Sequence, residues 1–239
     1  MGNRKDIGNQ LLAALSGEDF ARLERRMSLV SLPRGQVLYE AGAEVDTVWL
    51  PESGLISLIS VMLSGDSIET SVVGCEGGVG FIEAAGSGVM FSRAMVQMPG
   101  RSWRIPASVY REALDASPGM RRVVQDHIEL LITESRQAIA CMGLHQVEQR
   151  LARWLLEAQD RSGGADRLPL TQELLSVMLG VQRTTVSAHA ARLQAEGAIR
   201  YSRGMIEIID RGGVERHACE CYATNHRFRA MIEARPGRG

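Results

Sequence analysis

Hydrophobic residues along this chain change their spacing twice. Between Ile7 and Met27 they recur three or four residues apart, the spacing of buried helix faces, and Ser16 can cap a second helix. From Ser28 to about Arg104 they alternate with polar residues in short runs, and the helical spacing returns further along the chain. The pattern predicts a helical start, a β-rich middle and a mainly helical C-terminal half.

The middle segment has the turn residues of an antiparallel sheet. Pro33-Arg34-Gly35, Ser64-Gly65-Asp66 and Pro99-Gly100 are among the breaks, and glycine supplies the positive φ that hairpins need. The expected strands are residues 28–32, 37–39, 47–50, 55–62, 67–73, 94–98 and 102–105. These strands predict a sandwich or barrel. A glycine-dense stretch at residues 74–86 could hold an anion, but we expect a connecting loop with a short helix.

The longest predicted helix begins after Ser117, an N-cap followed by Pro118, and runs to about Gly143. Its apolar positions alternate in steps of four and three, which is the spacing that pairs parallel helices. This seam consists of Ile128, Ile132, Ser135, Ile139 and Met142, whereas Val124, Leu131 and Ala138 can pack on the sandwich. Two apolar faces predict a homodimer, and burial of the whole helix within one subunit is the alternative.

Residues 168–203 have the pattern of a helix-turn-helix. Thr171 can cap the first helix, Gly180 allows a left-handed turn, and the second helix is expected from near Gln182 to about Ala195. The expected inward side of the second helix is Val186, His189, Ala190 and Leu193. Strand-like residues 199–201 and 206–208 follow, which predicts a wing.

The outward side of the second helix carries short or fork-shaped groups that fit a DNA major groove. Arg183 can donate two hydrogen bonds to a guanine edge, and Thr184 and Ser187 can reach bases or phosphates. Residues 181–203 contain four arginines and one glutamate, in a chain of net charge −1. The predicted DNA-binding residues are Thr171, Gln182, Arg183, Thr184, Ser187, Ala188, Arg200 and Arg203. Any two short helices around a glycine give a similar pattern, but the wing and its arginines favour DNA.

Composition excludes several classes of protein. The chain has 239 residues, of which 45% are hydrophobic and 23% charged, enough for one large or two ordinary globular domains. It has no apolar run long enough to cross a membrane, and its first residues lack a secretion signal, so we expect a cytoplasmic protein. No Ser/His/Asp group or pair of carboxylates stands at motif spacing, so we do not expect an enzyme.

The four cysteines are too few and too scattered for a disulfide framework, so reduced thiols are expected. Cys219 and Cys221 stand in the only cluster with soft ligands, His217-Ala218-Cys219-Glu220-Cys221, and the sequence offers no clear second pair of ligands. We therefore expect no metal site there, but a partly buried C-terminal segment. His127 and His145 are expected on helix surfaces or interfaces.

A β-sandwich, a long helix and a winged helix-turn-helix in this order resemble the Crp/Fnr family of bacterial transcription regulators. Residues 32–42 (LPRGQVLYEAG) look like the family's opening hairpin, and residues 180–186 (GVQRTTV) resemble its turn and the start of its recognition helix. The resemblance implies an α+β fold with an N-terminal jelly roll like that of cyclic-nucleotide-binding domains. The expected domains are residues 1–116 for sensing, 117–143 for dimerisation, 144–222 for DNA binding and 223–239 as a C-terminal tail.

The resemblance also implies a homodimer with recognition helices about one DNA turn apart, and duplex DNA and RNA polymerase as partners. The implied effector pocket comprises Gly77, Gly78, Gly80, Ser92, Arg93, Ser135 and Arg136. Family members that bind cyclic nucleotides carry Gly-Glu-Leu/Ile-Gly and Arg-Ser/Thr-Ala motifs. Here Gly78 replaces the glutamate, and Ser92-Arg93-Ala94 reverses the order of serine and arginine. This order turns Arg93 to the opposite face of a strand unless a bulge restores it.

We therefore do not expect cAMP or cGMP as the effector, and the cofactor is unknown. The N-terminal cysteine cluster of the oxygen-sensing branch is absent from the sequence, as is a haem pattern. Two functions from different classes remain. The first is a sequence-specific DNA-binding regulator, and the second is a sensory ligand-binding module whose C-terminal domain contacts protein. The arginines of the helix-turn-helix and wing favour the first.

Overall fold

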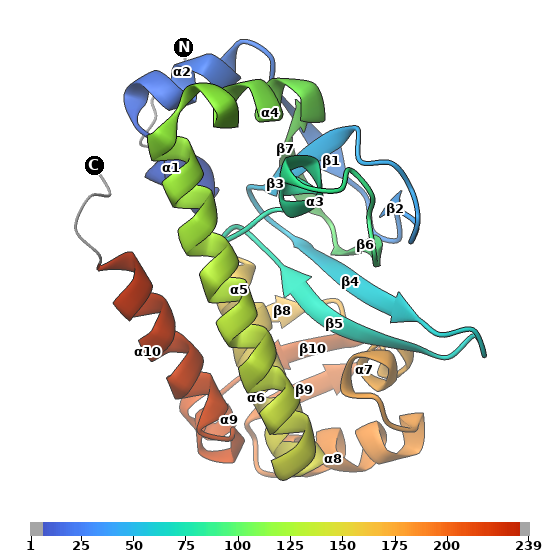
Figure 1. The fold of residues 1–239 in the computed structure, drawn as a ribbon. Helices are drawn as coiled ribbons and strands as arrows, with labels where there is room; N and C mark the ends of the chain where they lie inside the picture. The colour runs from blue at the N-terminus through green and yellow to red at the C-terminus, as the bar shows by residue number, and fades with distance from the viewer. Residues whose placement is uncertain (1–6, 235–239) are drawn as a thin grey trace.

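The computed structural model describes residues 7–234, which form the predicted α+β fold (Figure 1). Two short helices come first, α1 (Gln10–Ala14) and α2 (Gly17–Glu24). Side chains cap both, because Asn9 accepts a hydrogen bond from the Leu12 amide and Ser16 accepts one from the Asp19 amide. Leu12 and Leu23 are fully buried, so these helices close one end of the N-terminal core.

Seven antiparallel strands form the predicted sandwich. They are β1 (Ser28–Leu32), β2 (Val37–Tyr39), β3 (Thr47–Pro51), β4 (Leu55–Val61), β5 (Ser67–Val73), β6 (Arg93–Met98) and β7 (Gly100–Pro106). One sheet has the order β1-β7-β3 and the other β2-β6-β4-β5. The glycine-dense stretch contributes a short helix, α3 (Phe81–Ala85), as expected. Every expected strand is confirmed, with ends that differ by at most two residues.

Three helices connect the sandwich to the C-terminal part: α4 (Ala107–Ala116), α5 (Pro118–Leu144) and α6 (Val147–Arg161). Ser117 caps α5 by accepting a hydrogen bond from the Met120 amide at 3.1 Å. The first half of α5 packs on the sandwich, where Val123 and Val124 belong to its core. In the second half Cys141 is buried and Leu131 still packs on the sandwich core, whereas Ile132, Ile139 and Met142 are exposed.

The C-terminal part is a winged helix-turn-helix followed by two helices. It contains β8 (Arg167–Leu168), α7 (Gln172–Leu179), α8 (Arg183–Ala195), β9 (Ile199–Ser202), β10 (Met205–Ile208), α9 (Arg211–His217) and α10 (Cys221–Glu233). Strand β10 lies between β8 and β9 in one small sheet. The sequence predicted neither β8 nor the last two helices. Where a tail was expected from residue 223, the chain continues as α10, which lies alongside α5 (Figure 1).

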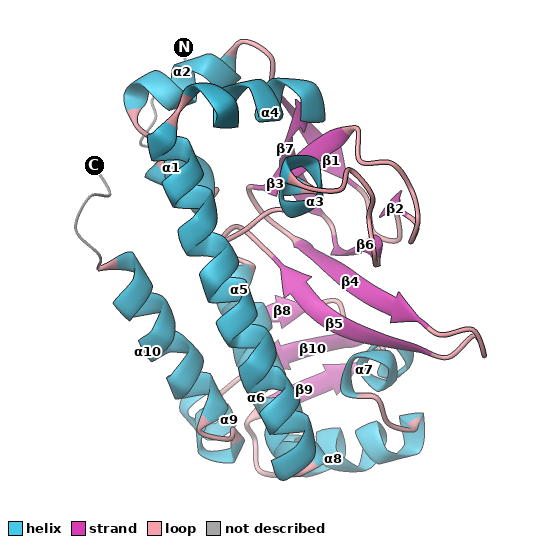
Figure 2. Cartoon of the chain, in the orientation of Figure 1, coloured by secondary structure: helices cyan, strands magenta, loops and turns pink. Residues whose placement is uncertain are grey.

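The two parts of the molecule share apolar packing. Leu55, Val72 and Met98 of the sandwich belong to the same core as Trp154 and the buried residues of the helix-turn-helix. The ribbon of β4 and β5 reaches over α7, which is visible in Figure 2. We call the contact of β4, β5 and β6 with α6 and α7 the sheet–helix interface. Among residues 7–234, no helix combines the length and the apolar character that a membrane crossing requires.

Candidate nucleic-acid interface

The helix-turn-helix has the geometry that its sequence predicts. Thr171 caps α7 by accepting a hydrogen bond from the Leu174 amide at 3.2 Å, and Gly180 ends α7 in the left-handed region with φ of 64°. Val186, Ala190 and Leu193 of α8 are buried, while His189 is half-buried and lies 3.4 Å from a Glu148 oxygen. The inward side of α8 therefore packs on α6 and α7, and its other side is free.

The outer side of α8 presents the predicted groove-facing residues to solvent. Gln182, Arg183, Thr184 and Ala188 are exposed, whereas Ser187 is half-buried and donates to the Arg183 carbonyl at 3.0 Å. Gln172 of α7, which the sequence analysis did not select, accepts a hydrogen bond from Arg183 Nε at 3.1 Å. This bond leaves the two terminal nitrogens of the guanidinium available, which are the atoms that pair with a guanine edge.

The wing stands beside the first turn of α7. Arg200 pairs with Glu207 across the β9–β10 ladder at 3.0 Å, and both groups are partly exposed. Arg203 lies at the wing tip, is exposed and has a φ of 50°. A Cβ on the adjacent Gly204 would come within 3.1 Å of Thr171, so the wing tip and the α7 N-terminus are in contact. Within residues 7–234 Arg203 forms no ion pair.

A cavity of about 350 Å³ lies between the sandwich, α3 and α5. Four of the predicted effector residues line it, namely Gly78, Gly80, Ser135 and Arg136. Most other lining residues are apolar, and Glu83 of α3 adds a carboxyl group whose pKa is raised because burial disfavours its charged form. The cavity therefore has one arginine and one carboxyl group on a mostly apolar wall.

The other predicted effector residues, Gly77, Ser92 and Arg93, lie outside this cavity. Gly77 packs against His127, since a Cβ there would lie 2.9 Å from the imidazole Nε2. Arg93 pairs with Glu40 at 2.9 Å and lines a separate hollow near α7, and Ser92 lines neither. A Cβ on Gly78 would lie 2.5 Å from Leu50. Close packing thus accounts for two of the glycines.

The predicted seam of α5 faces solvent in the single chain. The side chains of Ile132, Ile139 and Met142 are 46%, 72% and 49% exposed, and Ser135 is also exposed, while Ile128 is half-buried. The alternative of a helix wholly buried within one subunit is therefore wrong. Large apolar side chains in a row on one helix face are typical of a surface that another chain covers.

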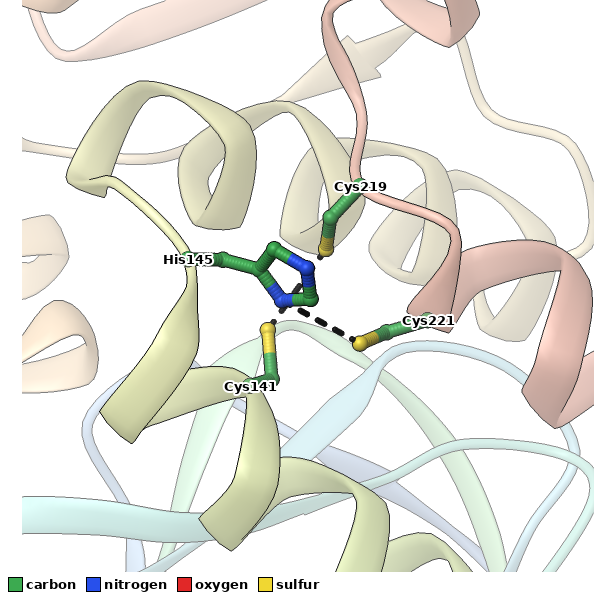
Figure 3. A group of neighbouring side chains, drawn as sticks. All are labelled: Cys141, His145, Cys219 and Cys221. Carbon is green, nitrogen blue, oxygen red and sulfur yellow. Dashed lines mark hydrogen bonds between the residues drawn. The ribbon is translucent and has the colours of Figure 1, made fainter.

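The expectation that Cys219 and Cys221 lack a second pair of ligands is also wrong. Cys141 and His145, at the end of α5, lie beside them, and one donor atom from each of the four residues lies within 4.8 Å of the others (Figure 3). Cys141 Sγ lies 3.5 Å from Cys219 Sγ, and His145 Nδ1 lies 3.5 Å from Cys221 Sγ. The pairs are far apart in sequence, which is why no spacing motif revealed them. We call this group the Cys₃His cluster.

Comparisons with known proteins agree with the fold and with the helix-turn-helix described above. Residues 149–216 match the family model of the Crp-like helix-turn-helix domain, whereas no curated protein matches the chain. FixK2 from Bradyrhizobium japonicum is 15% identical, with a TM-score of 0.69 over 81% of this chain and 98% of that one. A Crp/Fnr-family regulator from Thermus thermophilus is 23% identical, with a TM-score of 0.65 over 80% and 98%. At these identities the similarity establishes a shared fold.

Proposed function

We propose that this chain, a Crp/Fnr-type transcription regulator with a helix-turn-helix DNA-binding domain, acts as a homodimer that recognises a specific duplex sequence through α8. One observation carries the proposal. Arg183 is exposed at the first position of α8, and its Nε donates to Gln172, which leaves its two terminal nitrogens available for other partners. A guanidinium oriented in this way can donate two parallel hydrogen bonds to a guanine.

The neighbouring residues suit two different contacts, with bases along α8 and with phosphate at the wing. Thr184 and Ala188 are small and exposed on the same side of α8, so bases can approach the helix closely. Arg203 at the wing tip has no acidic partner among the described residues, so phosphate is a suitable ligand for it. Arg200 is shared with Glu207 and would have to release it to bind phosphate. We further propose that regulation proceeds through RNA polymerase, as the family resemblance implies.

The test separates base reading from phosphate binding. Wild-type protein is first used to select its preferred fragments from genomic DNA, and binding is then titrated at several salt concentrations. Arg183→Ala should cost roughly 1–3 kcal/mol per half-site and relax the preference at one operator position, because phosphate contacts cannot replace a base contact. Arg203→Ala should weaken specific and random duplex alike and reduce the salt slope by about one charge per subunit.

Arg22→Ala is the matched control, because it removes the same charge from an ion pair with Glu18 on α2, in the N-terminal part of the molecule. It should change neither the motif nor the salt slope. If the wild-type protein selects no fragment, the C-terminal domain does not read DNA and the alternative of a protein partner gains support. If Arg183→Ala selects the wild-type motif unchanged, the role given to Arg183 is wrong.

For the N-terminal domain we propose an effector other than a cyclic nucleotide. The cavity beside α5 supports this, since Arg93 is paired with Glu40 away from it and Gly78 stands where a ribose-binding glutamate would be. Arg136 and Glu83 on an otherwise mostly apolar lining favour a small, mostly apolar ligand with a polar end over a dianionic or highly hydroxylated one.

A further inference from the structure

The Cys₃His cluster is built from two short sequence pairs on two helices. Cys141 and His145 are one helical turn apart, so the last turn of α5 and its C-cap present them on one side. Cys219 lies in the loop between α9 and α10, and Cys221 is the first residue of α10. The three thiols are 0%, 3% and 1% exposed and contact one another as a small core separate from the two apolar cores.

The spacing of the donor atoms matches a single tetrahedral metal ion. Zinc binds thiolate sulfur at about 2.3 Å and imidazole nitrogen at about 2.0–2.1 Å, so the edges of a Cys₃His tetrahedron are about 3.4–3.8 Å. The distances from Cys141 Sγ to Cys219 Sγ and from His145 Nδ1 to Cys221 Sγ are both 3.5 Å. Movements of about 1 Å would bring all four donors, now within 4.8 Å of one another, to these edges.

Outer groups orient the donors as they do in metal sites. His145 Nε2 lies 3.1 Å from a carboxylate oxygen of Glu220, so the Nδ1 lone pair is directed toward the thiols. A histidine that binds metal through one nitrogen usually donates its other N–H to a carboxylate in this way. Gln137 donates from its amide nitrogen to Cys221 Sγ at 3.0 Å, which would stabilise a thiolate there.

We propose that Cys141, His145, Cys219 and Cys221 bind one Zn²⁺ ion in a tetrahedral structural site. Four protein ligands leave no open position, as in sites that fix a fold and do not catalyse. Iron–sulfur clusters spread their ligands over two or more metal atoms and mainly use four cysteines, so a set this compact with one histidine favours a single ion. The cluster joins the end of α5 to the start of α10 and includes the C-cap residue between α5 and α6.

The position of the site gives the ion a mechanical role. The connection from α5 to α6 passes through His145, and any rotation of the C-terminal domain about α5 must bend the chain there. A bound ion would tie this connection to Cys219 and Cys221, which follow the winged helix-turn-helix in sequence. It would therefore fix the direction in which α8 points relative to α5. This role holds whether the partner of α8 is DNA or protein.

Metal content and cobalt spectroscopy of the full chain test the site. The protein is purified under reducing conditions, incubated with Zn²⁺, desalted and analysed for metal, and we expect about one zinc per chain. The Cys219→Ser and Cys221→Ser variants should each retain much less zinc than the wild type. Cys75→Ser is the matched control, because Cys75 is a free, half-buried thiol outside the cluster, and it should bind as the wild type does.

Cobalt keeps the test decisive if the variants fail to fold, because it uses the wild-type chain. Co²⁺ in a site with three thiolates should give intense tetrahedral bands in the visible range and thiolate charge-transfer bands, which added Zn²⁺ should abolish. The proposal is overturned if the wild type retains no zinc, if it gives only the weak spectrum of octahedral cobalt, if the variants retain as much zinc as Cys75→Ser, or if anaerobic protein contains iron and sulfide.

Discussion

Among single residues, Glu69 of β5 stands out because its carboxyl group is enclosed in the sheet–helix interface. It accepts hydrogen bonds from Trp154 Nε1 at 3.1 Å, Ser57 Oγ at 2.5 Å and Gln97 Nε2 at 3.3 Å. Burial disfavours the charged form and raises the pKa of Glu69 to about 7, although the bonds from Ser57 and Trp154 and the charge of Arg161 act in the opposite direction. The interface therefore contains a group that titrates near neutral pH.

The raised pKa predicts that the interface loses stability as pH rises. Below the ordinary value of 4.5 the carboxyl is protonated in both folded and unfolded chains, so it costs nothing. Between 4.5 and about 7 only the unfolded chain releases the proton, and the cost reaches on the order of 3 kcal/mol above pH 7. Glu69→Gln should therefore be more stable than wild type at pH 8 and should flatten the decline between about pH 5 and 7.

Urea unfolding at fixed protein concentration and several pH values measures this effect. Glu112→Gln, an exposed change on α4, is the matched control and should follow the wild-type pH profile. If Glu69→Gln lowers stability at pH 8 and leaves the shape of the profile unchanged, the carboxyl is already ionised without cost in the folded protein.

At the scale of elements, the sequence predicts those helices and strands whose apolar pattern lies within one short stretch of chain. The strands of the sandwich followed from alternation, and the helix-turn-helix followed from Gly180 and the apolar positions beside it. Strand β8 was missed because it has only two residues. Helix α10 was missed because its contacts with α5 and α6 are largely polar, such as Arg229 with Glu134 and Asn225 with Glu157, so it lacks a continuous apolar stripe.

The same distinction separates the candidate site that the sequence predicts from the one that it does not. The exposed face of α8 could be predicted because every residue on it belongs to one helix. The Cys₃His cluster could not, because Cys141 and Cys219 are 78 residues apart and meet only when α10 packs on α5. The bond between Gln172 and Arg183 also joins two helices, and its length depends on the angle between them.

The exposed seam of α5 predicts how the chain dimerises. Ile132→Asp together with Ile139→Asp would place two charges per chain in an apolar contact, and the double variant should be monomeric at micromolar concentration. Sedimentation velocity gives the oligomeric state. Ala140→Asp introduces a charge at an exposed position on a different face of α5 and should leave the dimer intact. A double variant that sediments as a dimer would show that another surface pairs the chains.

The cavity between the sandwich and α5 predicts weak or absent binding of cyclic nucleotides. Gly78 and Gly80 offer no side chain to a ribose, and Arg93 is paired with Glu40 outside the cavity. Calorimetric titration with cAMP and cGMP should therefore show no submicromolar binding. Arg136→Ala serves to interpret a positive result, since Arg136 is the only arginine lining the cavity among the described residues. A submicromolar dissociation constant that this variant abolishes would overturn the prediction.

At the scale of the whole molecule, the proposed domain boundaries do not coincide with the boundaries of the cores. We propose residues 1–116, 117–143 and 144–222 as functional units, yet Leu55, Val72 and Met98 complete the core around Trp154. Gln97 also donates to Met178 Sδ at 3.0 Å across the sheet–helix interface. The C-terminal domain thus depends on the sandwich for part of its apolar packing.

This shared packing predicts the behaviour of a fragment. Residues 117–234 retain the whole Cys₃His cluster but lose the three apolar residues of the sandwich, so Trp154 and Met178 become exposed. The fragment should melt at a lower temperature than the full chain and bind a dye specific for exposed apolar surface. Circular dichroism against temperature measures this. A fragment that melts cooperatively at the temperature of the full chain would show that the sandwich contributes nothing to this core.

The sheet–helix interface also determines where this chain could be divided and joined to part of another. The simplest place to join the N-terminal part of one chain to the C-terminal part of another is the end of α5. In this molecule a junction there would place Trp154 and Met178 against the sheet of another protein. The side chains would no longer fit closely, and the C-terminal core would lose packing. A working chimaera would have to carry the outer face of β4, β5 and β6, with Leu55, Val72 and Met98, along with the C-terminal domain. The part that must be transferred together is therefore the two surfaces that contact each other, one on the sandwich and one on α6 and α7.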